Sequence, residues 1–177
     1  MKVSLLVAFD LHKAIGFQNT LPWDAPEELR WVSYVTRKVQ DPNKRNAVLM
    51  GRKTWESIPR QRRPLHGRLN LVVSSTLIIG QAYSDVEAFR DFESAIEHVN
   101  SMPNIETVFL FGGESIYRQG MDSDIVDEIL ATEINTECHA DTYFPPIPVE
   151  FHMTSVRHVT LGQLDARRLV YKRSRGR

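Results

Sequence analysis

Apolar runs alternate with amphipathic stretches along most of the 177 residues. Short apolar runs bounded by turn residues are typical of buried strands, whereas apolar residues at helical spacing indicate helices. The runs predict strands over 3–9, 47–50, 69–74, 108–111, 125–133, 153–159 and 168–173, with a further short strand over 86–89. The amphipathic stretches predict helices over 26–39, 53–58, 92–101 and 114–121.

This alternation favours one α/β domain over residues 1–177, a length that suits a single core. Strands separated by helices tend to pair in parallel, with helices on both faces of the sheet. The last two predicted strands have no helix between them, so we expect them to form an antiparallel hairpin.

Charge and cysteine content narrow the function classes. Lys plus Arg and Asp plus Glu both number 22, and a net charge of zero argues against nucleic acid as the main ligand.

Cys138 has no second cysteine to pair with, and the first apolar run is too short for a signal peptide, so we expect a cytoplasmic protein. No apolar run reaches the ~18 residues of a membrane span. The six histidines lack metal-ligand spacing, so we expect no metal site.

The start of the first predicted helix carries a candidate proton donor. Glu28 lies beside Leu29 and one turn before Val32. A carboxyl group among apolar side chains is a candidate acid, because desolvation raises its pKa towards neutrality. The alternative is that Glu27 and Glu28 only complement the positive N-terminus of the helix.

Three further places could bind anions. The glycines at 112–113 follow an apolar strand and open a helix, where backbone N–H groups can approach a phosphate; a plain strand-to-helix turn is equally consistent. Residues 52–54 place two basic side chains and a hydroxyl at another helix start. Arg68 begins a strand, and its planar fork suits bidentate binding of a carboxylate; an ordinary surface charge is the alternative.

Five blocks of the sequence resemble motifs of the dihydrofolate reductases, in that family's order and spacing. They are residues 14–31, 50–59, 63–75, 111–117 and 141–145. The resemblance implies a central eight-stranded, mostly parallel twisted sheet with four helices on both faces. It also implies NADPH-dependent reduction of 7,8-dihydrofolate to tetrahydrofolate, by hydride transfer to C6 with protonation of N5. Such an enzyme is an oxidoreductase acting on a CH–NH group in one-carbon and thymidylate metabolism. We expect a monomer that binds dihydrofolate and antifolates, and no membrane.

The resemblance also implies roles for individual residues. Glu28 becomes the only ionisable side chain at the pterin, oriented by Thr132. The loop over 14–24, with Leu21 and Trp23 packing inward, closes over the nicotinamide. The implied substrate-binding residues are Leu6, Val7, Ala8, Glu28, Leu29, Val32, Ile58, Leu65, Arg68, Phe111 and Thr132. Val32 stands where most members carry phenylalanine.

The implied cofactor site draws on several blocks. Its residues are Ala8, Ile15, Gly16, Leu21, Gly51, Arg52, Lys53, Thr54, Ser74, Ser75, Thr76, Arg90, Phe111, Gly112, Gly113, Glu114, Ser115, Ile116 and Tyr117. In the family the Gly-Gly peptide is cis, and the following helix start holds the pyrophosphate. The group formed by Arg52, Ser74, Ser75 and Arg90 implies recognition of the 2′-phosphate, and hence NADPH rather than NADH. Glu114 stands where the family has a small residue, so we expect its side chain to point away.

Three alternatives remain open at this point. A related reductase of riboflavin biosynthesis would share the sheet and the cofactor, although Glu28 together with Arg68 favours folate. An inactive nucleotide- or RNA-binding module is opposed by the zero net charge and the intact acid. A half of a fused reductase–synthase gains no support from a chain that ends after its last predicted strand.

Overall fold

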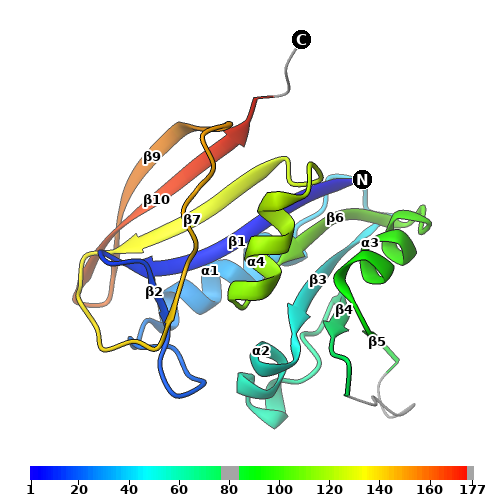
Figure 1. The fold of residues 1–177 in the computed structure, drawn as a ribbon, viewed down its shortest axis with the longest axis horizontal. Coiled ribbons are helices and arrows are strands. Elements are labelled where there is room, and N and C mark those ends of the chain that lie inside the picture. The colour runs from blue at the N-terminus through cyan, green and yellow to red at the C-terminus, as the bar shows by residue number, and fades with distance from the viewer. Residues whose placement is uncertain (77–83, 175–177) are drawn as a thin grey trace.

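The computed structural model describes residues 1–76 and 84–174. Its main sheet has eight strands in the order β5-β4-β3-β6-β1-β7-β10-β9 (Figure 1). The strands are β1 (Lys2–Asp10), β3 (Arg45–Gly51), β4 (Arg68–Val73), β5 (Val86–Phe89), β6 (Ile105–Leu110), β7 (Glu128–Ile134), β9 (Phe151–Leu161) and β10 (Leu164–Arg173). Neighbouring strands from β5 to β7 pair in parallel, and β10 pairs antiparallel with both β7 and β9. The predicted fold class is confirmed.

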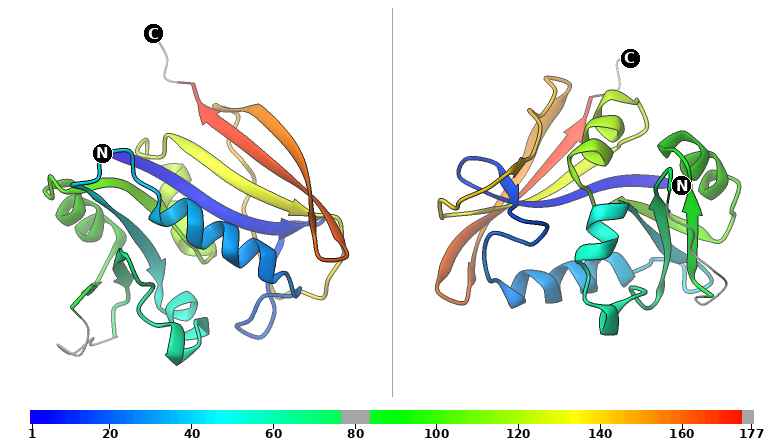
Figure 2. Two further views of the ribbon diagram at one scale, coloured as in Figure 1. Left: turned by 180° about the vertical axis from the view of Figure 1, so that it is seen from behind. Right: turned by 60° about the horizontal axis from the view of Figure 1, so that its bottom comes forward.

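Four α-helices cover the two faces of the sheet, as predicted. They are α1 (Pro26–Arg37), α2 (Arg52–Ser57), α3 (Phe92–Asn100) and α4 (Glu114–Asp122). Because successive side chains of a strand point to opposite faces, β1 contributes to both cores. Leu5 and Val7 pack in the cluster that contains residues of α3 and α4, whereas Leu6 packs in the cluster under α1 and α2. Figure 2 shows α1 lying across its face of the twisted sheet.

The boundaries differ from the sequence prediction in a few places. The strand expected over 125–133 begins only at Glu128, and Val126 is buried without belonging to it. The segment expected to be a loop over 14–24 begins with the short strand β2 (Ala14–Gly16), which pairs with β8 (Thr142–Tyr143). A 3₁₀ turn, η1 (Arg60–Arg62), was also not predicted. Strands of two or three residues are too short to show a period in the sequence, so only their tertiary partners reveal them.

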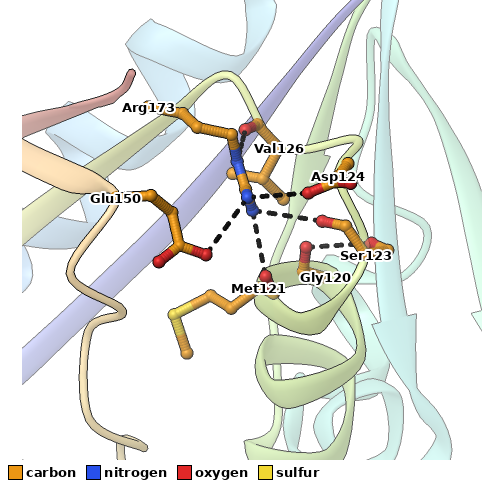
Figure 3. A network of polar contacts seen from close by, with 7 residues as sticks. All are labelled: Gly120, Met121, Ser123, Asp124, Val126, Glu150 and Arg173. Carbon is orange, nitrogen blue, oxygen red and sulfur yellow. Dashed lines mark hydrogen bonds and ion pairs between the residues drawn. The ribbon is translucent and has the colours of Figure 1, made fainter. Parts of the chain in front are cut away.

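The last strand is tied to the rest of the domain by one buried arginine. Arg173 donates hydrogen bonds to the backbone carbonyls of Met121, Ser123 and Val126 and forms ion pairs with Asp124 and Glu150 (Figure 3). These contacts join the end of β10 to the turn between α4 and β7. They hold the antiparallel hairpin against the parallel part of the sheet.

No helix in residues 1–76 or 84–174 combines the length and the apolar character needed to cross a membrane. In the same residues, no group of three or more His, Cys, Asp or Glu side chains is placed to hold a metal ion.

Candidate active site

One large cleft collects most of the predicted site residues. Its volume is about 1460 Å³, and its walls come from β1, α1, α2, the end of β4, the start of α4 and the loop after β2. Sites for a single small ligand usually span about 300–1,000 Å³, so this cleft has room for two ligands side by side. A second cavity, of about 590 Å³, lies beside β7, β9 and β10 and contains none of the predicted site residues.

All but three of the predicted site residues line the large cleft; the exceptions are Thr132, Gly112 and Arg90. Thr132 is fully buried behind Glu28, and Gly112 forms the turn that shapes the wall. Arg90 is exposed and follows β5 directly. The amide of Ser74 donates to the carbonyl of Phe89 over 2.8 Å, so Arg90 begins beside the serine-rich end of β4.

Glu28 is the buried acid of the cleft. Pro26 occupies the first turn of α1, where its missing N–H costs nothing, and the amide of Glu28 donates to the carbonyl of Ala25. The side chain of Glu28 therefore points inward from the first turn, and the residue is only 4% exposed. The hydroxyl of Thr132 donates to Oε1 of Glu28 over 2.6 Å, as the resemblance implied. Burial raises the pKa of Glu28, and the hydrogen bond from Thr132 lowers it only in part.

Arg68 lies at the start of β4 and is buried, with 6% of its surface exposed. Its Nη1 donates to the hydroxyl of Thr36 over 2.9 Å, and its Nε donates to the carbonyl of His66 over 3.1 Å. It forms no ion pair with any carboxylate in the described part of the chain. Burial and the nearby charge of Arg37 lower the pKa of Arg68 to about 10. Buried charges are normally paired, so this arginine is suited to an anionic ligand.

The turn before α4 brings backbone to the cleft wall. The peptide bond between Gly112 and Gly113 is cis, as the resemblance implied. Gly112 has a φ of +96°, and a Cβ there would lie 2.7 Å from the ring of Tyr117, so only glycine fits. A Cβ on Gly113 would meet only Thr54, at 3.8 Å. The backbone at Gly113 and the free N–H groups of the α4 start can therefore be approached by a phosphate.

Acidic and basic side chains near this turn are already paired. Glu114 forms an ion pair of 2.8 Å with Arg118, one turn further along α4, which offsets the negative charge beside the anion site. Arg52 contacts Glu56 and the hydroxyl of Thr76, each over 2.7 Å. Both ion pairs are largely exposed, so each stabilises the fold by at most about 1 kcal/mol and can be exchanged for a ligand phosphate.

Comparison with known proteins shows the family of the chain. The family model described as dihydrofolate reductase matches residues 2–173. The chain belongs to the dihydrofolate reductase family. A dihydrofolate reductase of Aedes albopictus is 36% identical over 155 residues, which cover 86% of this chain and 83% of the relative. A putative dihydrofolate reductase of Caenorhabditis elegans is 41% identical over 145 residues, or 80% of this chain and 76% of the relative.

A bifunctional dihydrofolate reductase-thymidylate synthase of Glycine max is 38% identical over 148 residues, which cover 81% of this chain and 28% of that relative. Dihydrofolate reductases are oxidoreductases that act on a CH–NH group, reducing dihydrofolate to tetrahydrofolate in folate metabolism with a nicotinamide cofactor. The family assignment favours this activity over that of a riboflavin-pathway reductase or a binding module.

The loop over the dihydrofolate reductase cleft differs from the expectation in one respect. Trp23 is buried at 8% exposure, but Leu21 is 49% exposed and lies at the mouth of the cleft. The expected inward packing therefore holds for Trp23 and not for Leu21: Trp23 packs in a cluster with residues of β7, β9 and β10, whereas Leu21 lines the open cleft. The loop is tethered by Asp141, whose carboxylate accepts the amide of Gln18 over 2.9 Å. That hydrogen bond lowers the pKa of Asp141.

A second tether, at the base of the loop, was missed by the sequence analysis. Asp10 is fully buried and accepts hydrogen bonds from the amides of His12, Ala14 and Cys138, at 2.8–2.9 Å. Its only signal in the sequence is a single acid at the end of an apolar strand. It fixes the exit of β1 and so positions the loop that follows.

The sequence analysis also missed Arg168 of β10. Its Nη2 lies 3.3 Å from Oε2 of Glu28, so this carboxyl group has a charged neighbour that the resemblance did not imply. Arg168 is absent from the lining of the cleft. Several side chains that do line it were also not predicted, among them Asn19, Thr20, Ser33, Arg37, Gln61, Arg62, His66 and Thr142.

Proposed function

We propose that this chain reduces 7,8-dihydrofolate to 5,6,7,8-tetrahydrofolate with NADPH, by hydride transfer to C6 and protonation of N5. The observation that carries the proposal is Glu28, a buried acid that lines the cleft and whose pKa is raised by burial. A carboxyl group with such a pKa holds a proton closer to neutral pH than an exposed one does, as general-acid chemistry requires. Glu28 holds the amino and N3 edge of the pterin and promotes the arrival of a proton at N5.

Two buried groups of opposite charge suit the two ends of the substrate. Glu28 lies at the start of α1 and binds the hydrogen-bond donors of the pterin. Arg68 carries a cation that no carboxylate of the described chain neutralises, which suits the α-carboxylate of the glutamate tail. Ile58 and Leu65 line the cleft as apolar wall for the ring between the two ends. The ligand is thereby oriented along the cleft, with its pterin beside the cofactor region.

The part of the cleft lined by α2, the end of β4 and the start of α4 fits a nicotinamide dinucleotide. The evidence is the open backbone at Gly113 and the free N–H groups at the start of α4, which suit a pyrophosphate. Arg52 and the hydroxyl groups of Ser75 and Thr76 line the cleft where a 2′-phosphate would add charge, which favours NADPH. When bound, the cofactor supplies the hydride. The protein sets distance and orientation and, through the tethered loop that carries Trp23, limits access of water.

The test is to replace Glu28 by glutamine and follow the oxidation of NADPH in the presence of dihydrofolate. Glu28→Gln should cut turnover at pH 7 by ~100-fold or more, the usual size of a general-acid contribution. The deficit should shrink as the pH falls, because solvent then protonates the substrate directly. NADPH binding, measured separately by fluorescence, should stay unchanged.

Glu27→Gln is the matched control. Glu27 is adjacent in the sequence, but its side chain is 37% exposed and pairs with Arg30 on the surface. This variant should keep wild-type turnover. Wild-type turnover in Glu28→Gln, or a severe loss in Glu27→Gln, would exclude the proposed role of Glu28.

A further inference from the structure

Glu28 is held from two sides, by one group on each of two adjacent strands. Thr132 of β7 and Arg168 of β10 are partners in the antiparallel register, so their side chains lie next to each other on the α1 face of the sheet. Thr132 donates to Oε1 of Glu28, and Nη2 of Arg168 lies 3.3 Å from Oε2. Each carboxylate oxygen therefore has its own partner, and rotation of the carboxylate breaks both contacts.

Helix α1 also fixes the arginine. The guanidinium carbon of Arg168 lies 4.1 Å from the centre of the Trp31 ring. Trp31 follows Glu28 by three residues, so both project from neighbouring positions of α1. The guanidinium is thus stacked on one residue of the helix and ion-paired with another. Trp31 does not line the cleft, so this clamp lies behind the acid.

Burial of the Arg168 side chain destabilises the folded state. The side chain is only 19% exposed, and its Nε is buried without a hydrogen-bond acceptor among the described residues. A buried donor without an acceptor destabilises the folded state. Replacing a buried ion pair by apolar side chains is often neutral or stabilising. The contacts of Arg168 therefore indicate that it acts on Glu28 and does not serve to stabilise the fold.

Other charged groups near Glu28 are turned away from it or lie in solvent. On α1, Glu27 and Arg30 pair with each other, and Arg30 is 70% exposed. On β9, Arg157 faces Arg168 in the register but is exposed. The next residues along β7 and β10, Glu133 and Arg167, pair with each other on the opposite face of the sheet. β1 contributes Leu6 and Ala8, which carry no charge.

We propose that Arg168 is a positioning residue for the proton donor: its guanidinium fixes Oε2 of Glu28 and sets the pH at which that carboxyl group releases its proton. The inference rests on the proposed function only in assigning Glu28 that donor role. Burial favours the neutral acid, whereas the adjacent cation favours the carboxylate. Arg168 thereby opposes the effect of burial on the pKa of Glu28. Because Arg168 does not line the cleft, it acts through Glu28 and not on the substrate.

The test is a direct titration of Glu28 by ¹³C NMR, in the ligand-free protein labelled at glutamate side-chain carboxyl groups. The signal of Glu28 is the one missing from Glu28→Gln. Arg168→Met keeps most of the side-chain volume and removes the charge. The midpoint of the Glu28 titration should rise by about one pH unit or more in Arg168→Met, since a cation next to a carboxyl group lowers its pKa by roughly 1–3. The fall of turnover with rising pH should move to higher pH by the same amount.

Two further variants separate charge from packing. Arg168→Lys keeps the charge and loses the planar stack, so its midpoint should stay closer to the wild type than to Arg168→Met. Arg157→Met removes the neighbouring, exposed arginine of β9 and should leave the midpoint unchanged. Thermal unfolding of each variant checks the fold, and Arg168→Met should be at least as stable as the wild type.

An unchanged Glu28 midpoint in Arg168→Met would overturn the inference, even if turnover fell. Equal midpoints in Arg168→Lys and Arg168→Met would also overturn it, because the charge would then have no effect. The titration needs no turnover, so its outcome is independent of the proposed function. Wild-type turnover in Glu28→Gln would refute the proposed function and leave the measured midpoints standing.

Discussion

Replacing Arg68 by methionine should leave the stability of the protein nearly unchanged and make it a poorer binder of glutamate-tailed ligands. The pKa of Arg68 is about 10, against an ordinary value of 12.5. Each pKa unit corresponds to about 1.36 kcal/mol, so the folded state carries this charge at a cost of about 3 kcal/mol. Methionine removes that cost and keeps the apolar stem of the side chain in place.

The variant also loses two hydrogen bonds, to Thr36 and to the carbonyl of His66, each contributing about 1.5 kcal/mol or more because the guanidinium that donates them is charged. Thr36 still donates its hydroxyl to the carbonyl of Val32, and His66 is exposed, so neither group is left buried without a partner. The loss of these bonds offsets the removed cost, so the free energy of unfolding should change by less than about 1 kcal/mol. For a chain of this size that keeps Tm within about 4 °C of the wild type.

Ligand binding should change much more than stability. A charge-assisted hydrogen bond contributes about 1.5–3 kcal/mol, so the Kd of methotrexate, which carries the glutamate tail, should rise by about 10- to 150-fold. Trimethoprim lacks the tail, and its Kd should stay within about twofold of the wild type because it makes no contact with Arg68. Fluorescence titration measures both constants, and a thermal scan measures Tm. A variant that is less stable and binds both inhibitors equally poorly would refute the reasoning, since Arg68 would then support the fold and not the ligand.

Three other substitutions test the predicted pterin wall and the predicted 2′-phosphate site. Val32 lines the cleft, and Val32→Phe should add an aromatic contact worth about 0.5–1.5 kcal/mol beyond its buried area. The dissociation constants of inhibitors should fall by up to about tenfold, while the affinity for NADPH stays unchanged. Weaker inhibitor binding in a folded variant would mean that the added ring does not reach the ligand. Arg52→Ala, and separately Arg90→Ala, should raise the Kd of NADPH by about 10- to 150-fold and change that of NADH little. Equal losses for the two cofactors would exclude these arginines from a 2′-phosphate site.

Much of the fold could be predicted because apolar residues recur along its main strands and helices with the spacing typical of each. The run from Val3 to Phe9 is apolar on both faces, which is typical of a strand covered by helices on both sides. The helix that begins at Pro26 has the start signal of proline and two acids. The prediction of eight strands, however, depended on the family resemblance as well as on the pattern. Short paired segments such as β2 and β8 gave no signal, because each is stabilised by the other and not by its own sequence.

The candidate acid itself could also be read from the sequence. Glu28 lies in the first turn of a helix that begins at Pro26, beside Leu29 and one turn before Val32, which made it a candidate for a desolvated carboxyl group. The same residues left open that Glu27 and Glu28 only complement the helix N-terminus. Its bond to Thr132 was expected from the resemblance and is confirmed, at 2.6 Å. These residues lie 104 positions apart, so no local pattern could have joined them.

The electrostatic setting of the acid was decided by tertiary structure alone. Arg168 lies 140 residues from Glu28 and belongs to a strand whose charges look like those of any exposed hairpin. Only the antiparallel pairing of β10 with β7 places it beside Thr132, and only the packing of α1 brings Glu28 and Trp31 against it. The sequence by itself determined the main strands and helices and which residues can hold a proton or an anion, because the spacing of apolar residues and the chemistry of a side chain are local properties. The tertiary structure decided which charges meet, since a pKa or an ion pair depends on the distance between atoms and on the water excluded around them.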